Sequence, residues 1–195
     1  MESSSFLRPA VIVPIAAVVV IALGVVIGLI TLGASKRRAA ALRRWVHGAY
    51  ALWTGGEDCG TWAQDRATAS LASWYGATGP GHLWKVIAEL KDGQTGNPAW
   101  DQVRALDLLR IGRAANFLDD DACWTEAGKI AVGLQRRYRS WDELAAQFEA
   151  GMLAWHRRSN VTDPNELGRV QRHLPTLTQS VWPAIPFDAT LVGAD

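Results

Sequence analysis

The chain has 195 residues and a formal net charge of +1, from 20 lysine and arginine residues and 19 acidic ones. The balance is uneven, because from Trp45 onward 14 lysine and arginine residues face 18 acidic ones, a balance of −4. A nucleic-acid-binding protein carries a basic footprint, so this composition argues against one. Cys59 and Cys123 are the only cysteines and form no CxxC motif, which fits reduced thiols better than a disulfide framework.

Residues 9–35 contain no charged side chain, and 15 of these 27 residues are Val, Ile or Leu. A helix of about 20 apolar residues spans a bilayer core of about 30 Å. A cleaved signal peptide has a shorter apolar core of about 7–15 residues and a basic start, which this chain lacks. We therefore predict a retained transmembrane helix over residues 9–35.

Basic residues near this helix lie almost entirely on its carboxyl side, since only Arg8 precedes it. The positive-inside rule then leaves residues 1–8 as a short external tail and places the rest in the cytoplasm, at a bacterial inner membrane. Gly24 and Gly28 form a small-xxx-small pattern, from which we derive the hypothesis of a homodimer through this helix. The bilayer is the first expected partner, and five cations are expected to contact lipid headgroups: Lys36, Arg37, Arg38, Arg43 and Arg44.

The apolar stripe continues through a basic juxtamembrane helix at residues 36–55, so the membrane helix is expected to run on into a globular domain at residues 56–195. A second helix is expected from Thr61, with Trp62 and Trp74 on its core side, and a shorter one over residues 82–91.

Three later helices have recognisable first turns. Asn97 is a predicted N-cap with Pro98 after it, and the acidic run 119–121 suits the positive end of the next helix dipole. Ser140 and Glu143 form a capping box before a stripe that runs from Trp141 to Trp155. Gly151 lies in that stripe, where it would admit a close neighbouring helix.

Two charged pairs, Asp101–Arg104 and Asp107–Arg110, are spaced i,i+3 and are expected on a wetter helix face. A last capped helix is expected after Asp163 and ends before Pro175. The two prolines near Trp182 predict an extended strap rather than a helix. No alternating pattern indicates a strand, so the predicted fold class is all-α: a single transmembrane helix and then a compact, Trp-rich, multi-helix domain.

The ten tryptophans all follow the apolar run, and we expect them to pack mainly in the core. The alternative is an aromatic ligand cage or an exposed binding patch.

One pattern of residues is spread over the second half of the chain: Ala99-Trp100-Asp101, Arg104-Ala105, Arg110, Gly112, Ala114-Ala115, Ala122, Trp124, Leu134-Gln135, Tyr138, Ser140-Trp141-Asp142-Glu143, Gly151, Trp155 and Trp182-Pro183. With this pattern, the order of the expected elements resembles a bacterial domain-of-unknown-function family, number 1266, over about residues 70–190. The family brings no known activity, cofactor or catalytic residue, and the resemblance implies an all-α bacterial domain. Arg113 stands where that family usually has an aromatic residue.

Catalytic motifs are missing from the sequence, as are nucleotide-binding loops and helical metal-ligand pairs, so no cofactor and no metal are predicted. The weak catalytic candidates are Asp101 and Arg104 on one helix with Asp142 and Glu149 on another, which would need to share a cleft for acid–base work. Structural pairing of these helices is the alternative.

The favoured function is a membrane-anchored binding or regulatory module with a protein partner, of which an immunity-like protein is one variant. The alternative function is an enzyme, such as a hydrolase, with an acidic and arginine-lined cleft between helices.

Overall fold

In a computed structural model the backbone is described for residues 12–57, 62–160 and 164–191. Side chains are described from residue 31 onward within these ranges, except at residues 166 and 167. The described chain is helical, without strands, which confirms the all-α class. The elements are α1 (Ile12–Thr54), α2 (Gln64–Tyr75), α3 (Pro80–Lys91), α4 (Pro98–Ala114), α5 (Asp120–Arg137), α6 (Trp141–Arg158), α7 (Pro164–Leu167), α8 (Arg169–Thr176), a π-helical turn (Leu177–Val181) and a 3₁₀ turn (Trp182–Ala184).

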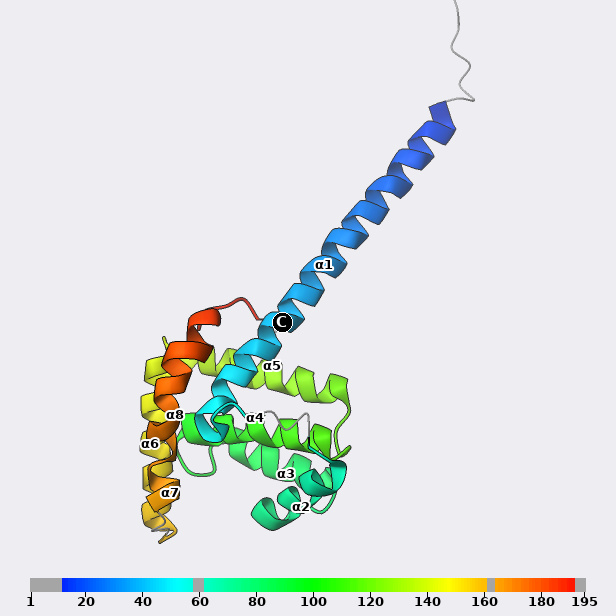
Figure 1. The fold of residues 1–195 in the computed structure, drawn as a ribbon. Coiled ribbons are helices and arrows are strands. Elements are labelled where there is room, and N and C mark those ends of the chain that lie inside the picture. Colours follow the sequence, from blue (N-terminus) through cyan, green and yellow to red (C-terminus); the bar gives the residue numbers. More distant parts are fainter. Residues whose placement is uncertain (1–11, 58–61, 161–163, 192–195) are drawn as a thin grey trace, which may run out of the picture.

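Helix α1 is one continuous helix. Its N-terminal part projects from the other elements, and its C-terminal part packs among them (Figure 1). The predicted continuation of the first helix into the domain is therefore confirmed. Within the described part of the chain, no helix has the length and apolar character needed to cross a membrane. Most of the predicted span 9–35 lies outside the residues described with side chains. Gly24 and Gly28 also lie there.

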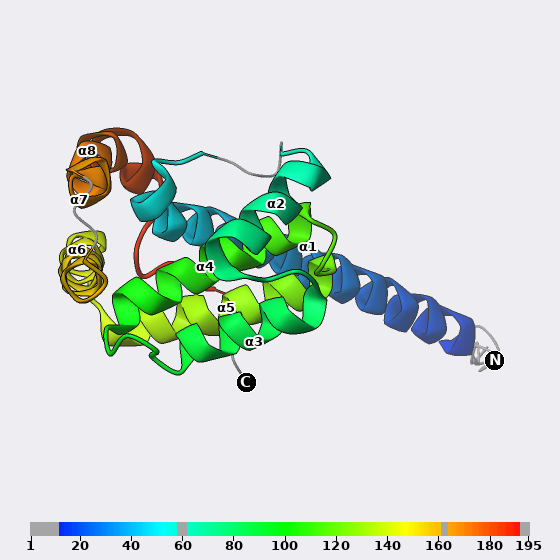
Figure 2. The same ribbon diagram turned by 90° about the horizontal axis from the view of Figure 1, so that it is seen from below.

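Helix α4 is the central element, and 12 of its 17 residues are buried. It contacts α1, α2, α3, α5 and α6, and in the view from below it crosses the middle of the domain with α6, α7 and α8 grouped at one end (Figure 2). A helix that is covered on most sides cannot keep one wet face. This environment decides where its charged residues lie.

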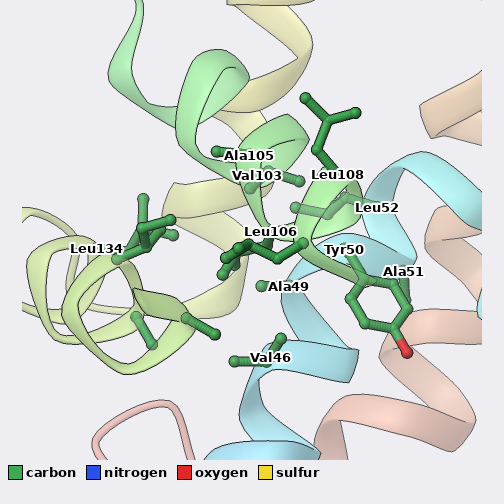
Figure 3. Packing of buried hydrophobic residues seen from close by; sticks show 14 of the residues in the cluster. Val46, Ala49, Tyr50, Ala51, Leu52, Val103, Ala105, Leu106, Leu108 and Leu134 are labelled. Atoms are coloured by element: carbon green, nitrogen blue, oxygen red, sulfur yellow. The ribbon is translucent and has the colours of Figure 1, made fainter. Parts of the chain in front are cut away.

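Apolar side chains pack together where α1, α4 and α5 meet (Figure 3). Val46 and Ala49 of α1 are buried with Leu106 of α4 and Leu134 of α5. Burial of a Val or Leu side chain contributes about 1.5–3 kcal/mol relative to its exposed state. The C-terminal part of α1, from Leu42 to Leu52, is thus part of the core.

The predicted helix starts are confirmed by their hydrogen bonds. Asn97 accepts from the Trp100 amide at 2.9 Å, and Asp119 accepts from the Ala122 amide at 2.8 Å. Ser140 accepts from the Glu143 amide at 3.1 Å. These caps depend only on residues within one turn, which is why the sequence reveals them.

Two expectations about the C-terminal segment are wrong. Helix α8 does not end before Pro175 but includes it, and the strap begins with a 3₁₀ turn at Trp182–Ala184. Pro175 removes one backbone donor, and the chain widens into the π-helical turn directly after it. Because Pro175 is exposed, its ring displaces no core side chain.

The expected second helix is also corrected. It begins at Gln64 after Ala63, which offers no side-chain cap, while Thr61 lies outside the described residues. Trp74 is 59% exposed instead of lying on the core side, and Trp62 precedes the helix and is only half-buried.

Gly151 sits where α6 meets the start of α4, as expected. An added Cβ would lie 2.5 Å from Asn97 Cγ and 2.6 Å from Trp100 Cβ. Gly151→Ala should therefore lower the free energy of unfolding by about 1–3 kcal/mol through overpacking, measured by urea denaturation.

Gly133 of α5 is the matched control, since its nearest foreign atom would be 3.9 Å away. Gly133→Ala should raise stability by about 0.5–1 kcal/mol through helix propensity. Equal effects of the two substitutions would contradict close packing at Gly151.

Candidate functional site

The predicted catalytic residues do not come together in any cavity described below. Asp101 is fully buried, and its Oδ2 accepts from the backbone amide of Thr95 at 2.9 Å. It therefore fixes the turn before α4 rather than facing solvent. Arg104 is half-buried on the same helix but faces aromatic rings, so the expected wet Asp101–Arg104 pair is wrong.

The two acidic candidates on α6 lie in other surroundings. Asp142 is exposed in the first turn of α6, and Glu149 is half-buried two turns further on. An exposed carboxylate at a helix start suits the helix dipole, so Asp142 has a structural reason to be there.

The expected headgroup cations fall into two groups. Lys36, Arg37 and Arg38 are exposed along α1. Arg43 and Arg44 lie further along the helix, where they border a cavity between α1, α4 and α5.

A second cavity, of about 250 Å³, is lined almost entirely by aromatic rings and arginine. Arg104 lies over three rings, with its guanidinium carbon 4.9 Å from the Trp100 centroid and 5.8 Å from that of Trp155. Arg169 of α8 lies over Trp53 of α1 at 4.1 Å. The lining residues are Trp53, Trp74, Tyr75, Trp100, Arg104, Trp155 and Arg169.

A third cavity, of about 240 Å³, shares Trp53, Trp74 and Arg169 with the second and is more polar. We name the two together the Trp–Arg cleft. Five arginines and two carboxylates line it, so its local charge is positive within a domain that is acidic as a whole. The additional lining residues of the polar part are Thr54, Glu57, Trp62, Arg66, Asp107, Arg110, Arg172 and His173.

Asp107 and Arg110 form a buried ion pair at the floor of the polar part. Arg110 Nη2 donates to Asp107 Oδ1 at 2.7 Å, and Nη1 donates to the Glu57 carbonyl at 2.7 Å. Burial raises the pKa of Asp107, and the Arg110 guanidinium opposes that rise. The expectation of a wetter face for this pair is wrong, because α1 and α2 cover this side of α4. Removing one partner of such a pair costs about 3–5 kcal/mol.

Sequence reasoning missed the cleft because its walls are distant in the chain. Trp53 and Arg169 belong to the first and the eighth helix, and no local spacing connects them. The only available signal was the number of tryptophans, of which the core holds Trp45, Trp100, Trp141 and Trp182 in buried positions. Five of the rest are partly buried and pack against this core, and Trp74 is 59% exposed, so the tryptophans pack mainly in or against the core as expected.

His173 connects α8 to the end of α1 at the cleft wall. Its Nδ1 lies 3.4 Å from the Leu52 carbonyl oxygen, and a Cβ at Gly55 would meet its ring at 2.8 Å. Burial lowers the pKa of His173, and Arg169 and Arg172 lower it further. The folded chain therefore favours the neutral ring more than the unfolded chain does.

Neither a metal centre nor an activated nucleophile is formed by the described residues. Among them, no group of three or more His, Cys, Asp or Glu side chains is placed to hold a metal ion. Burial raises the pKa of Cys123 to about 11, so its thiol stays protonated at neutral pH. Cys59 lies outside the described residues.

A family model described as a protein of unknown function (DUF1266) matches residues 37–187. The match begins near the start of the basic segment of α1 and includes every wall of the Trp–Arg cleft. No curated protein and no solved structure matches the chain.

The lowered pKa of His173 predicts a pH dependence of stability. The unfolded chain takes up this proton at about pH 6.5, whereas the folded chain takes it up only at lower pH. The free energy of unfolding should therefore fall as the pH drops from about 6.5 through the folded pKa. In urea denaturation at a series of pH values, His173→Gln should flatten this part of the profile.

The control is His82→Gln, which removes an exposed histidine of α3. A profile that His82→Gln flattens as much as His173→Gln would contradict the role of His173.

Proposed function

The chain belongs to the DUF1266 family, and we propose that it is a membrane-held binding module whose Trp–Arg cleft receives an acidic segment of a protein partner. The observation that carries this proposal is the composition of the cleft. Trp, Tyr and Arg are the residue types that dominate the energetics of protein interfaces. Here they line one continuous cleft.

Trp74 supports a protein partner because it stands at the rim of the cleft with 59% of its surface exposed. An exposed tryptophan beside half-buried ones gives a partner a large, rigid apolar contact. Trp62 and Trp74 lie edge to face, with centroids 6.4 Å apart. The aromatic surface thus extends from the half-buried wall out to solvent.

Charge complementarity gives the partner its acidic character. Arg104 and Arg169 place their positive charge over aromatic rings of the cleft, and a guanidinium binds an aromatic ring through its face and a carboxylate through its N–H groups. The acidic balance of the surrounding domain repels acidic segments elsewhere, so the local excess of arginine directs them to the cleft.

The membrane attachment is proposed from the apolar run at residues 9–35, which directly precedes the family match that begins at residue 37. In this arrangement α1 joins the span to the domain without a linker, since it is helical from Ile12 to Thr54. The domain would lie against the cytoplasmic face of a bacterial inner membrane.

A defined probe tests the cleft: a synthetic peptide of alternating glutamate and tyrosine, added to the full chain in detergent micelles. We expect saturable binding by calorimetry, which weakens with added salt. Arg104→Ala should weaken it about tenfold, because each lost hydrogen bond to a charged group is worth about 1.5–3 kcal/mol.

Arg137→Ala is the matched control, since Arg137 is an exposed arginine at the end of α5, away from the cleft lining. Binding that is absent in the wild type, equal for a lysine–tyrosine peptide, or weakened equally by Arg137→Ala would refute an acidic-segment site.

The topology is tested separately by fusing a reporter that is active only in the periplasm after Asp195. We expect the fusion to be inactive, because the positive-inside rule keeps the domain in the cytoplasm. The same reporter fused before Met1 should be active, and the opposite pattern would overturn the proposed orientation.

A further inference from the structure

A further cavity, of about 320 Å³, lies outside the Trp–Arg cleft, between α1, α4 and α5. Four arginines and one histidine border it, and no carboxylate is among its lining residues. Its apolar floor contains Leu106, Leu109 and Ala127. The polar and aromatic lining residues are Arg43, Arg44, His47, Tyr50, Arg110, Arg113, Cys123 and Trp124.

Trp124 organises two of these cations. The guanidinium carbon of Arg43 lies 5.0 Å from the Trp124 ring centroid, and that of Arg113 lies 5.6 Å from it. Both arginines also approach Asp120, at 3.9 Å and 3.1 Å respectively. Asp120 is exposed at the start of α5, so one surface carboxylate holds two guanidiniums at the cavity mouth.

We propose that this cavity is a binding site for a phosphate group, held by Arg43, Arg44 and Arg113. The guanidinium fork matches the oxygens of phosphate and donates paired hydrogen bonds to them. A phosphate carries more charge than the single carboxylate of Asp120, so it can replace Asp120 as the shared partner. The volume of the cavity suits one small head group.

The position of the site along α1 allows two sources for the phosphate. Along an α-helix, Arg43 lies about 12 Å beyond Ser35, the last residue of the apolar run. A lipid headgroup of the inner leaflet and a free phosphorylated metabolite would both present the same chemistry there. The experiment therefore separates these sources.

The readout is the fluorine NMR signal of Trp124 in the full chain labelled with 5-fluorotryptophan, assigned with Trp124→Phe. Inorganic phosphate, added to the chain in uncharged detergent, should shift this signal saturably, because two of the binding guanidiniums lie over its ring. Arg113→Gln should weaken the binding about tenfold, the loss expected for a charge-assisted hydrogen bond.

Asp120→Asn gives a result of opposite sign. It removes the competing carboxylate, so phosphate should bind more tightly, by several-fold, while the fold keeps its Asp119 cap. Arg136→Gln is the matched control, because Arg136 is an exposed arginine of α5 outside the cavity lining and outside the cations expected to contact headgroups. It should leave the affinity unchanged.

The second arm places the chain in phosphatidylcholine vesicles with or without phosphatidic acid, and without free phosphate. A Trp124 shift only with phosphatidic acid identifies a headgroup site, and a shift only with inorganic phosphate identifies a soluble ligand. Failure of both arms overturns the proposal, as does a shift that Arg113→Gln leaves intact or that equimolar chloride reproduces. The peptide test of the Trp–Arg cleft is independent of either result.

Discussion

The Trp–Arg cleft and the cavity beside α5 both depend on the attachment of the first helix to the last segment of the chain. Two tryptophan indole bonds make this attachment, and a third joins α6 to the same last segment. The Trp45 indole N–H donates to the Phe187 carbonyl at 2.8 Å, and that of Trp182 donates to the Gly48 carbonyl at 3.1 Å. The Trp141 indole donates to the Ile185 carbonyl at 2.7 Å and stacks on Trp182 at 5.5 Å. Each bond gives a buried indole N–H the acceptor that it needs away from water.

Because α1 is fixed at this point, its two faces contribute to two different sites. Trp53 reaches the Trp–Arg cleft, while Arg43 and His47 reach the cavity beside α5. The tryptophan pattern therefore has two physical roles in one molecule. Buried indoles position α1 and the C-terminal strap, and half-buried ones, paired with guanidiniums, line the surface that we propose for recognition.

The extent to which the sequence predicted this structure follows from the range of each interaction. Caps at Asn97 and Ser140 were predictable because donor and acceptor are three residues apart. The burial of Asp107 with Arg110 was not, because an i,i+3 pair has the same spacing on a wet or a covered helix face. The inclusion of Pro175 in α8 is opposed to the local preference of proline, and residues far apart in the chain build the cavities.

Arg110 lines both the Trp–Arg cleft and the cavity beside α5, so the two proposed sites share one guanidinium. Its guanidinium is oriented by Asp107 and the Glu57 carbonyl, so a ligand that draws it toward one cavity withdraws charge from the other. If binding of one ligand changes the affinity for the other by some factor, binding of the other changes the affinity for the first by the same factor. The buried Asp107–Arg110 pair can in this way couple binding in the cavity near α5 to binding in the Trp–Arg cleft beside α8.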